Sequence, residues 1–244
     1  MFASREQRIG AAGVVDIAFT DRHGGVSQAP FDSLNLSRSG PGAPADQRSN
    51  VALLAAAFDV RGFAMMRQVQ GADVGVVESL EDAQPTCDAL VTASAEVALC
   101  VRVGDCVPVV LGDPDAGVVA VAHAGRRGVA AGVVSSTVRA MRDAGAVSVE
   151  AWVGPHVCGS CYEVPAQLRD EVAAAVPASY ACTLRGTPSL DLGAGVTAQL
   201  VQQGCRVNDR SVCTLESADF FSYRRDGASS GRFAGIVVRR LVVP

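Results

Sequence analysis

A cysteine and a histidine flank two neighbouring apolar runs in the middle of the chain. Cys106 stands directly before Val107–Leu111, and His123 directly follows Val118–Ala122. The turn between the runs has an Asp-Pro-Asp core, so this pattern predicts a β-hairpin or tight strand connection. If the two strands are antiparallel, Cys106 and His123 emerge at the same end of a sheet. A thiolate beside an imidazole can hold a soft divalent metal or form a Cys–His nucleophile pair.

Glycines and arginines follow His123. Gly125 and Gly128 flank Arg126 and Arg127, and a helix is predicted over Arg127–Ala144. Backbone N–H groups at a helix start, together with guanidinium groups, favour an anion. The alternative is that Cys106 is a small packing residue and His123 caps a strand. The polar residues Asp105, Arg126 and Arg127 favour a functional site, because apolar packing alone would not need them.

Composition narrows the class of protein. The chain has 244 residues, of which 49% are hydrophobic and 19% charged, as in folded proteins. A net charge of −4 argues against nucleic acid as the main partner. All 21 basic residues are Arg, which excludes a Schiff-base or P-loop lysine. We find no signal peptide or membrane span, and eight cysteines without a secretion signal suggest reduced thiols and a cytoplasmic protein.

The remaining patterns predict an α+β fold. Strands outnumber helices and are mostly sequential, so we expect a single domain over residues 1–244, with mixed β-sheets packed between outer helices. Residues 29–50 are rich in Pro, Gly and Ser and predict a surface loop that overlaps the start of the first helix. The predicted strands are Val14–Thr20, Ala89–Thr92, Val97–Val103, Val147–Val153 and Phe233–Val243, with a β-turn-β unit of Met65–Val69 and Val74–Glu78; the other helices are Ser49–Phe58, Ala166–Val176 and Ala194–Gln203.

Three short motifs have competing interpretations. Cys158-Gly-Ser-Cys161 lacks the second Cys pair of a zinc ribbon, which leaves thioredoxin-like redox chemistry or a single functional thiol at Cys161. Residues 193–198, GAGVTA, match a dinucleotide fingerprint but lack the strand with an acidic end that should follow, so they predict a helix start. Residues 227–231, GASSG, match the nucleophile elbow of α/β-hydrolases, which needs a strand before it, a helix after it and a histidine later in the sequence. Here a strand follows and all histidines come earlier, so we reject this interpretation.

Blocks along nearly the whole chain resemble one family. GDCVPVVL at 104–111 and AVAHAGRRG at 120–128 are similar to the ADCxPVLL and AHAGWRG blocks of the laccase-domain, or multicopper-polyphenol-oxidase-like, proteins. The resemblance continues, in order, through TDRHGGVS, SLNL, RQVQGADV, CDALVT, GPHVCGSCYEV, LDLGAGVTAQL and CTLESADFFSYRRDGASSGR. Members of this family are understood as purine nucleoside phosphorylases with adenosine deaminase side activity.

The resemblance implies a set of site residues. The family holds zinc through the His of QVHG, the Cys of DCxP and the His of AHAG. These positions are Gln70, Cys106 and His123 here, so the first imidazole is replaced by an amide, a weaker zinc ligand. Catalytic roles fall on Cys106, His123, Arg127 and Arg224, and substrate contacts on Arg126, Asn35, Cys161 and Tyr223.

Further departures surround the same site. SRSGPGAPA replaces the family's GHVGDD after SLNL, Val51 replaces the Arg of its NR helix start, Arg126 replaces the Trp of AHAGWRG, and Ser160 replaces a Cys. Two hypotheses follow. The first is a monomeric, zinc-dependent purine nucleoside phosphorylase, with weak or substoichiometric zinc, that takes a purine nucleoside and phosphate. The second is a degenerate member that binds a nucleoside or a partner without turnover. Three histidines are too few for a multicopper oxidase.

Overall fold

The predicted hairpin forms the middle of a six-stranded sheet. The computed structural model describes residues 1–38 and 43–241. The hairpin strands are β7 (Val107–Asp113) and β8 (Val118–Ala124), paired antiparallel with Pro108 opposite His123. The hairpin prediction is confirmed. The strand order across the sheet is β12 (Arg206–Asp209), β9 (Glu150–Val153), β7, β8, β5 (Ala89–Thr92) and β4 (Val74–Val76).

A five-stranded sheet faces the first one. Its order is β1 (Phe2–Gly10), β2 (Gly13–Thr20), β13 (Phe233–Arg240), β6 (Ala98–Val103) and β3 (Phe63–Met65). The edge strand β1 was not predicted, because its charged sequence carries no buried apolar run. A separate two-stranded sheet consists of β10 (Tyr180–Cys182) and β11 (Pro188–Leu190).

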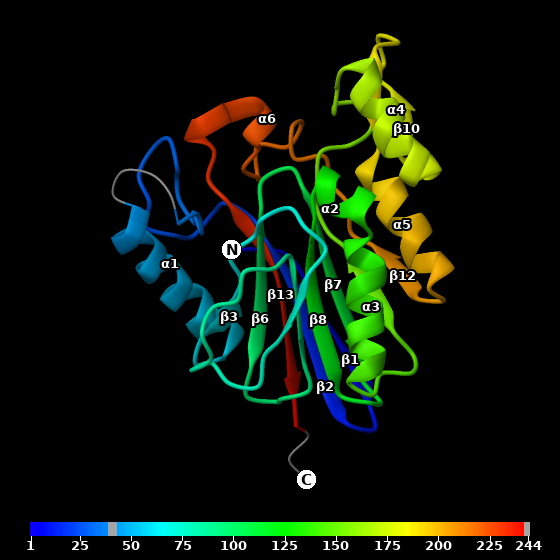
Figure 1. Ribbon diagram of the computed structural model, residues 1–244. Helices are drawn as coiled ribbons and strands as arrows, with labels where there is room; N and C mark the ends of the chain where they lie inside the picture. Colours follow the sequence, from blue (N-terminus) through cyan, green and yellow to red (C-terminus); the bar gives the residue numbers. More distant parts are fainter. Residues whose placement is uncertain (39–42, 242–244) are drawn as a thin grey trace.

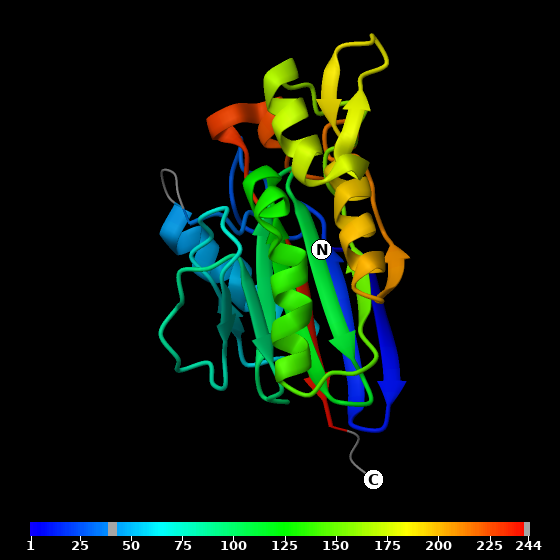
Figure 2. The same ribbon diagram turned by 45° about the vertical axis from the view of Figure 1, so that its right-hand side comes forward.

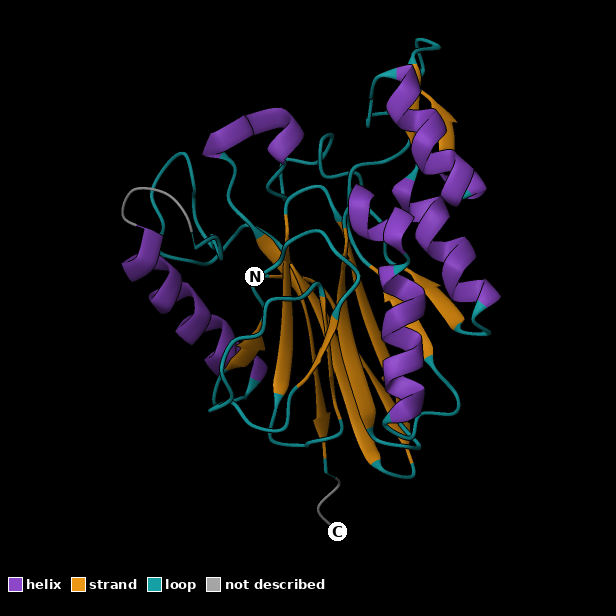
Figure 3. Cartoon of the chain, viewed as in Figure 1, coloured by secondary structure: helices purple, strands orange, loops and turns teal. Residues whose placement is uncertain are grey.

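The helices cover the outer faces of the two large sheets (Figure 1, Figure 3). The longest, α1 (Ala43–Phe58), packs on the five-stranded sheet. On the other side, α3 (Val133–Asp143) and α5 (Leu192–Gln202) pack on the six-stranded sheet, as the turned view makes plain (Figure 2). The shorter helices are α2 (Arg126–Ala131), α4 (Ala166–Ala175) and α6 (Tyr223–Asp226), with single turns at Pro177–Ser179 and Gly227–Ser229.

Alternation along the central strands explains this layering. On β7, Val109 and Leu111 pack under the helices, whereas Val110 packs between the two sheets. Both faces of the strand are therefore buried, which is why the sequence reads as a continuous apolar run. The α+β class with mixed sheets between outer helices is confirmed. The single-domain organisation over 1–244 stays a prediction. Within the described ranges, no helix is long and apolar enough to cross a membrane.

The predicted β-turn-β unit around Gln70 is wrong. Its two strands, β3 and β4, belong to different sheets, and each runs parallel to its own neighbour. The segment 66–73 therefore crosses from one sheet to the other. The pattern of two short apolar runs around a turn cannot tell a hairpin from such a crossing, because the partners of both strands are distant in sequence.

Helix boundaries also differ from the predictions. The first helix starts at Ala43 rather than Ser49, because a proline in the first turn is compatible with a helix. The predicted loop over 29–50 is wrong from Ala43 onward, and residues 39–42 lie outside the described part. The helix predicted over Arg127–Ala144 is divided at Gly132, which has a φ of 84°. The last predicted strand ends at Arg240, and residues 242 and 243 of that prediction are outside the described ranges.

Candidate functional site

Cys106 and His123 meet at the same end of the central hairpin. Because Val107 pairs with Ala124 and Pro108 with His123, the two side chains emerge beside the chain turn at Gly125. A Cβ atom on Gly125 would lie 3.2 Å from Cys106 Sγ and 3.5 Å from His123 Nε2. Both ligand-type atoms therefore face the same point, and glycine leaves that point open.

Asp88 orients the histidine. Its Oδ1 lies 2.8 Å from Nδ1 of His123, and both side chains are buried. A carboxylate on one ring nitrogen fixes the tautomer and the ring orientation and leaves the other nitrogen for a metal or substrate. Here that other nitrogen is Nε2, the atom that faces Gly125 beside Cys106.

The charge state of His123 follows from these neighbours. Burial alone would lower the pKa of His123, but interactions with Cys106 and the hydrogen bond to Asp88 outweigh it and raise the pKa to about 9. The hydrogen bond from His123 and the backbone N–H groups in turn keep the pKa of Asp88 below its ordinary value, against the effect of burial. His123 is therefore protonated at neutral pH without a metal, and a cation binding at Nε2 must displace that proton.

Asp88 also places Gln70. Its carboxylate accepts the backbone N–H groups of Val69, Gln70 and Gly71, at 3.0, 2.9 and 2.7 Å. These bonds hold Gln70 in the left-handed region, at a φ of 61°. Because Oδ1 of Asp88 serves both Gln70 and His123, the sheet-crossing segment lies directly against the histidine.

Asp105 connects the hairpin to the C-terminal segment. It is buried and has a φ of 88°, which is uncommon outside glycine. Its carboxylate accepts the Thr214 hydroxyl at 2.6 Å and the Arg224 backbone N–H at 2.5 Å, and its carbonyl accepts the N–H of Val157. Asp105 is thus a positioning residue, which brings three distant segments to the Cys106 side of the site.

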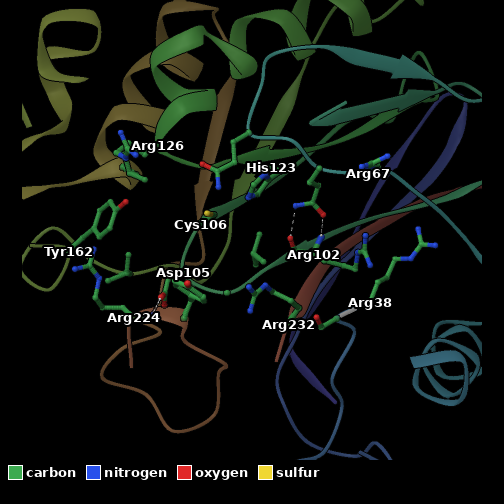
Figure 4. Close-up of a pocket in the computed structure, with 18 of the residues that line it drawn as sticks. Arg38, Arg67, Arg102, Asp105, Cys106, His123, Arg126, Tyr162, Arg224 and Arg232 are labelled. Carbon is green, nitrogen blue, oxygen red and sulfur yellow. Dashed lines mark hydrogen bonds between the residues drawn. The ribbon is translucent and has the colours of Figure 1, made fainter. Parts of the chain in front are cut away.

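A large pocket opens around Cys106 and His123. Its volume is about 1390 Å³. Figure 4 shows Arg126, Tyr162 and Arg224 on one side of the pair and Arg38, Arg67 and Arg102 on the other. The lining residues are Ser37, Arg38, Arg67, Gln68, Gln70, Gln84, Arg102, Val103, Gly104, Asp105, Cys106, His123, Arg126, Val157, Tyr162, Leu192, Tyr223, Arg224 and Arg232.

The pocket is cationic although the protein is acidic. Six of its lining residues are arginines, against one carboxylate, Asp105. Arg102 is half-buried, and this partial burial together with the charges of Arg38 and Arg232 lowers its pKa. Its guanidinium donates to the Leu36 and Met66 carbonyls, whereas its Nε has no hydrogen-bond partner among the described residues. Such a concentration of desolvated positive charge suits an anionic ligand.

The sequence-predicted residues divide into two groups. Gln70, Cys106, His123, Arg126, Tyr223 and Arg224 line the pocket together. Three others do not line it. The Arg127 side chain is exposed, Asn35 is buried and accepts the backbone N–H groups of Ser37 and Arg232, and Cys161 belongs to a separate cluster. The roles assigned to all nine residues stay predictions.

Sequence reasoning missed several residues of the site. The Asp88 carboxylate contacts His123 and three backbone N–H groups, yet in the sequence it is marked only by its place in the CDALVT block, directly before a buried strand. Tyr162 lies under the Arg224 guanidinium, with 4.9 Å from Cζ to the ring centroid. Burial and the charge of Cys106 raise the pKa of Tyr162, although Arg126 and Arg224 act in the opposite direction. Arg102 lies on β6 of the five-stranded sheet, and Arg232 directly precedes β13 of the same sheet; no local motif shows that they reach the pocket.

A second group of metal-ligand side chains lies outside the pocket. Cys158, Cys161, Cys213 and Glu216 each offer a ligand atom, and these atoms lie within 4.8 Å of one another. It is the one group of three or more His, Cys, Asp or Glu residues in the described ranges that could hold a metal ion. None of the eight cysteines, all of which lie in the described ranges, is paired in a disulfide, and their reduced state in solution stays a prediction.

Comparisons with known proteins agree on the family. The sequence profile of the family described as "Multi-copper polyphenol oxidoreductase laccase" matches residues 16–240. The chain therefore belongs to this laccase-like family, as its motif blocks predicted. A solved Neisseria meningitidis structure, described as DUF152, superposes with a TM-score of 0.86 at 31% identity, over 98% of this chain and 99% of that one. YlmD from Geobacillus stearothermophilus superposes at 0.82 and 31% identity, over 94% and 93%.

Relatives of known name point to one activity. A Streptomyces coelicolor protein named purine nucleoside phosphorylase is 51% identical over 229 residues, 90% of this chain and 93% of the relative. A Mycobacterium bovis protein of the same name is 43% identical over 224 residues, 89% of each chain.

Proposed function

We propose that this protein is a purine nucleoside phosphorylase, which converts adenosine or inosine and phosphate to the base and ribose 1-phosphate. The observation that supports this most is the pocket itself, in which six arginines line the walls around the Cys106–His123 pair. It belongs to a chain that is 51% identical to a protein of that name. A phosphate nucleophile needs a cationic site, and departure of a purine base needs a nearby hydrogen-bond donor.

The arginines would bind the phosphate. Arg126 and Arg224 line the pocket on either side of Tyr162 in the close-up view (Figure 4). Guanidinium groups bind phosphate oxygens in pairs, which adds orientation to affinity. Arg127, predicted to contact phosphate, is an exposed neighbour of Arg126, and its catalytic role is a separate point for experiment.

The aromatic residues would bind the base. Tyr162 keeps its proton at neutral pH because its pKa is raised, so its hydroxyl can donate to a leaving purine. Tyr223 also lines the pocket and can stack against the base. Asn35 would act on substrate only through Arg232, whose backbone N–H it holds.

The residues around His123 fit a metal in part. Cys106 and His123 offer a thiol and an imidazole to one point, and Asp88 orients the imidazole as metal-ligating histidines require. Gln70 lies beside them but offers only an amide, so we propose zinc of low occupancy there. When bound, zinc would supply a Lewis acid that polarises a bound oxygen or activates a water, the latter suiting adenosine deamination as a side activity.

A second candidate is a family member that binds nucleoside without turnover. The observation that favours it is Gln70, which stands at the position where the laccase-domain motif has a histidine. The protein would then keep the arginine-lined pocket and lose the chemistry. A monomeric state and a cytoplasmic location stay predictions under either candidate.

The deciding experiment is phosphorolysis by the purified protein. Adenosine and inosine are incubated with and without phosphate, the released bases are quantified by chromatography, and zinc is measured on the same sample. We expect adenine or hypoxanthine only when phosphate is present, and loss of this release in Cys106→Ala. Nucleoside binding by calorimetry with no base released would support the second candidate instead. Arg185→Met, in the exposed turn between β10 and β11, is the matched surface control.

A further inference from the structure

The Cys158-Gly-Ser-Cys161 turn has a counterpart elsewhere in the chain. Cys213-Thr-Leu-Glu216 has the same spacing, with a glutamate in the last position. A search for a second Cys-x-x-Cys pair overlooks it, because its fourth member is a carboxylate. The structure brings both turns together, so that their four ligand atoms lie within 4.8 Å of one another.

Backbone hydrogen bonds hold the two turns side by side. His156 and Cys213 form a parallel bridge, in which the His156 N–H donates to Val212 and the Thr214 N–H donates to His156. The first turn closes through the N–H groups of Cys161 and Tyr162, both donating to the Cys158 carbonyl. The Cys158 N–H then points to Cys213 Sγ at 3.5 Å. The juxtaposition therefore follows from the backbone and not from chance side-chain rotation.

The geometry matches a tetrahedral metal site. With Zn–S bonds of about 2.3 Å, tetrahedral ligands are roughly 3.8 Å apart. Cys161 Sγ and Glu216 Oε1 are 3.4 Å apart, and every pair of ligand atoms falls within the 4.8 Å limit. Three sulfurs with one carboxylate oxygen suit zinc, which accepts both ligand types, better than Mg²⁺ or Ca²⁺, which prefer oxygen.

Positive charge lies against the second turn. The guanidinium of Arg225 donates to the carbonyls of Thr214, Leu215 and Ser217, and so surrounds the turn that carries Cys213 and Glu216. Three thiolates and a carboxylate would leave a bound divalent ion with a net negative charge. Arg225 is placed to offset it.

We propose that Cys158, Cys161, Cys213 and Glu216 form a structural zinc site, separate from the Cys106–His123 pair. The site closes a link between residues 154–162 and 213–225. Both segments supply walls of the pocket, namely Val157 and Tyr162 from the first and Tyr223 and Arg224 from the second. With four protein ligands it leaves no open position for substrate, as in structural rather than catalytic zinc sites.

The test removes the pocket's own metal first. Cys106→Ala is purified, equilibrated with zinc, desalted and analysed for zinc by mass spectrometry. We expect one zinc per chain in this background. Adding Cys213→Ser should remove that zinc, whereas adding Cys182→Ser should not, because Cys182 is an exposed cysteine outside the cluster. Activity is not a readout, so failure of the proposed enzyme would leave this result unchanged.

A spectroscopic measurement covers the case in which Cys213→Ser does not fold. Glu216 is exposed, and Glu216→Ala should leave the fold intact. Cobalt-substituted Cys106→Ala should show thiolate charge-transfer bands and tetrahedral ligand-field bands. Glu216→Ala should keep the sulfur bands, alter the ligand-field bands and weaken cobalt binding at least tenfold. Zinc content that stays far below one per chain in Cys106→Ala, or a Cys158–Cys161 disulfide in the zinc-treated protein, would overturn the proposal.

Discussion

Asp88 Oδ1 lies 2.8 Å from His123 Nδ1 and also accepts the backbone N–H of Gln70 at 2.9 Å. One buried oxygen therefore joins β5, β8 and the segment that crosses between the sheets. It orients the only histidine of the pocket lining and fixes the loop beside it. This relationship makes Asp88 the first target for mutation.

Asp88→Asn should reduce both activity and stability. The amide of this variant has the shape of the carboxylate but cannot compensate the charge of the His123 imidazolium. Its NH₂ group would also face hydrogen-bond donors, either the ring N–H of His123 or the backbone N–H groups of residues 69–71. We expect phosphorolysis to fall about 10–100-fold, as for changes of residues that orient metal-binding histidines. The free energy of unfolding should fall by about 1–3 kcal/mol. Steady-state kinetics and urea unfolding measure the two effects. Asp73→Asn, an exposed aspartate nearby, is the control, and equal losses in both variants would contradict the role of Asp88.

Gln70→His should raise metal occupancy. The new imidazole would face the Cys106–His123 pair from the loop that Asp88 holds, and imidazole binds zinc better than an amide does. Zinc content should rise by up to one per chain over the wild type, and phosphorolysis by about tenfold or more. Elemental analysis and kinetics on one preparation give both numbers. Gln84→His, at another glutamine of the pocket, is the matched control.

The two outcomes of Gln70→His have different meanings. If zinc rises without activity, the binding protein without turnover becomes the better description. If zinc does not rise, the Gln70 side chain does not face the metal pair.

Arg126→Met and Arg127→Met should differ. Arg126 lines the pocket, whereas the Arg127 side chain is exposed. Losing one charge-assisted contact to phosphate costs about 1.5–3 kcal/mol. The KM for phosphate should therefore rise roughly 10–100-fold in Arg126→Met and much less in Arg127→Met. Kinetics at varied phosphate measure this, with Arg185→Met as the surface control. A larger rise of the KM for phosphate in Arg127→Met than in Arg126→Met would show that Arg127, and not Arg126, contacts the phosphate.

Asp113 should make stability depend on acid pH. Its carboxylate accepts four backbone N–H groups, those of Asp115, Ala116, Val147 and Ser148. Burial would raise the pKa of Asp113, but these bonds outweigh it and hold the pKa below its ordinary value. Its stabilising contribution is thus complete above about pH 4 and is lost as the pH falls through the lower folded-state pKa.

Comparison with Asp113→Asn tests this dependence. At neutral pH the free energy of unfolding of the variant should be about 1–3 kcal/mol lower than that of the wild type. This difference between the two proteins should become smaller in acid. Asp115→Asn is the control from the same turn, where the carboxylate accepts only the Ala11 N–H among the bonds we describe. If the difference in the free energy of unfolding between wild type and Asp113→Asn stays constant from neutral pH into acid, the ionised form of Asp113 is not the stabilising one.

The sequence by itself determined the elements whose contacts are local. The β7–β8 hairpin and the meeting of Cys106 with His123 were predictable, because each depends on residues close in the chain. The helix predicted to start at Ala194 was also found, although it begins two residues earlier, at Leu192. Motif blocks also placed the chain in its family. The edge strand β1 and the break at Gly132 were missed, because an edge strand needs no apolar face and a glycine does not by itself end a helix.

Only the tertiary structure decided which distant segments share the site. The placement of Gln70 depends on Asp88, the position of Arg224 on Asp105, and the Cys213-Thr-Leu-Glu216 turn on its bridge to His156. Each of these contacts joins residues from 18 to 119 positions apart, or crosses from one sheet to another. Hydrogen bonds of a buried carboxylate go to whichever donors the packed sheets bring near. No periodicity along the chain encodes which donors these are, so the partners of the buried carboxylates are set only when the sheets and helices pack together.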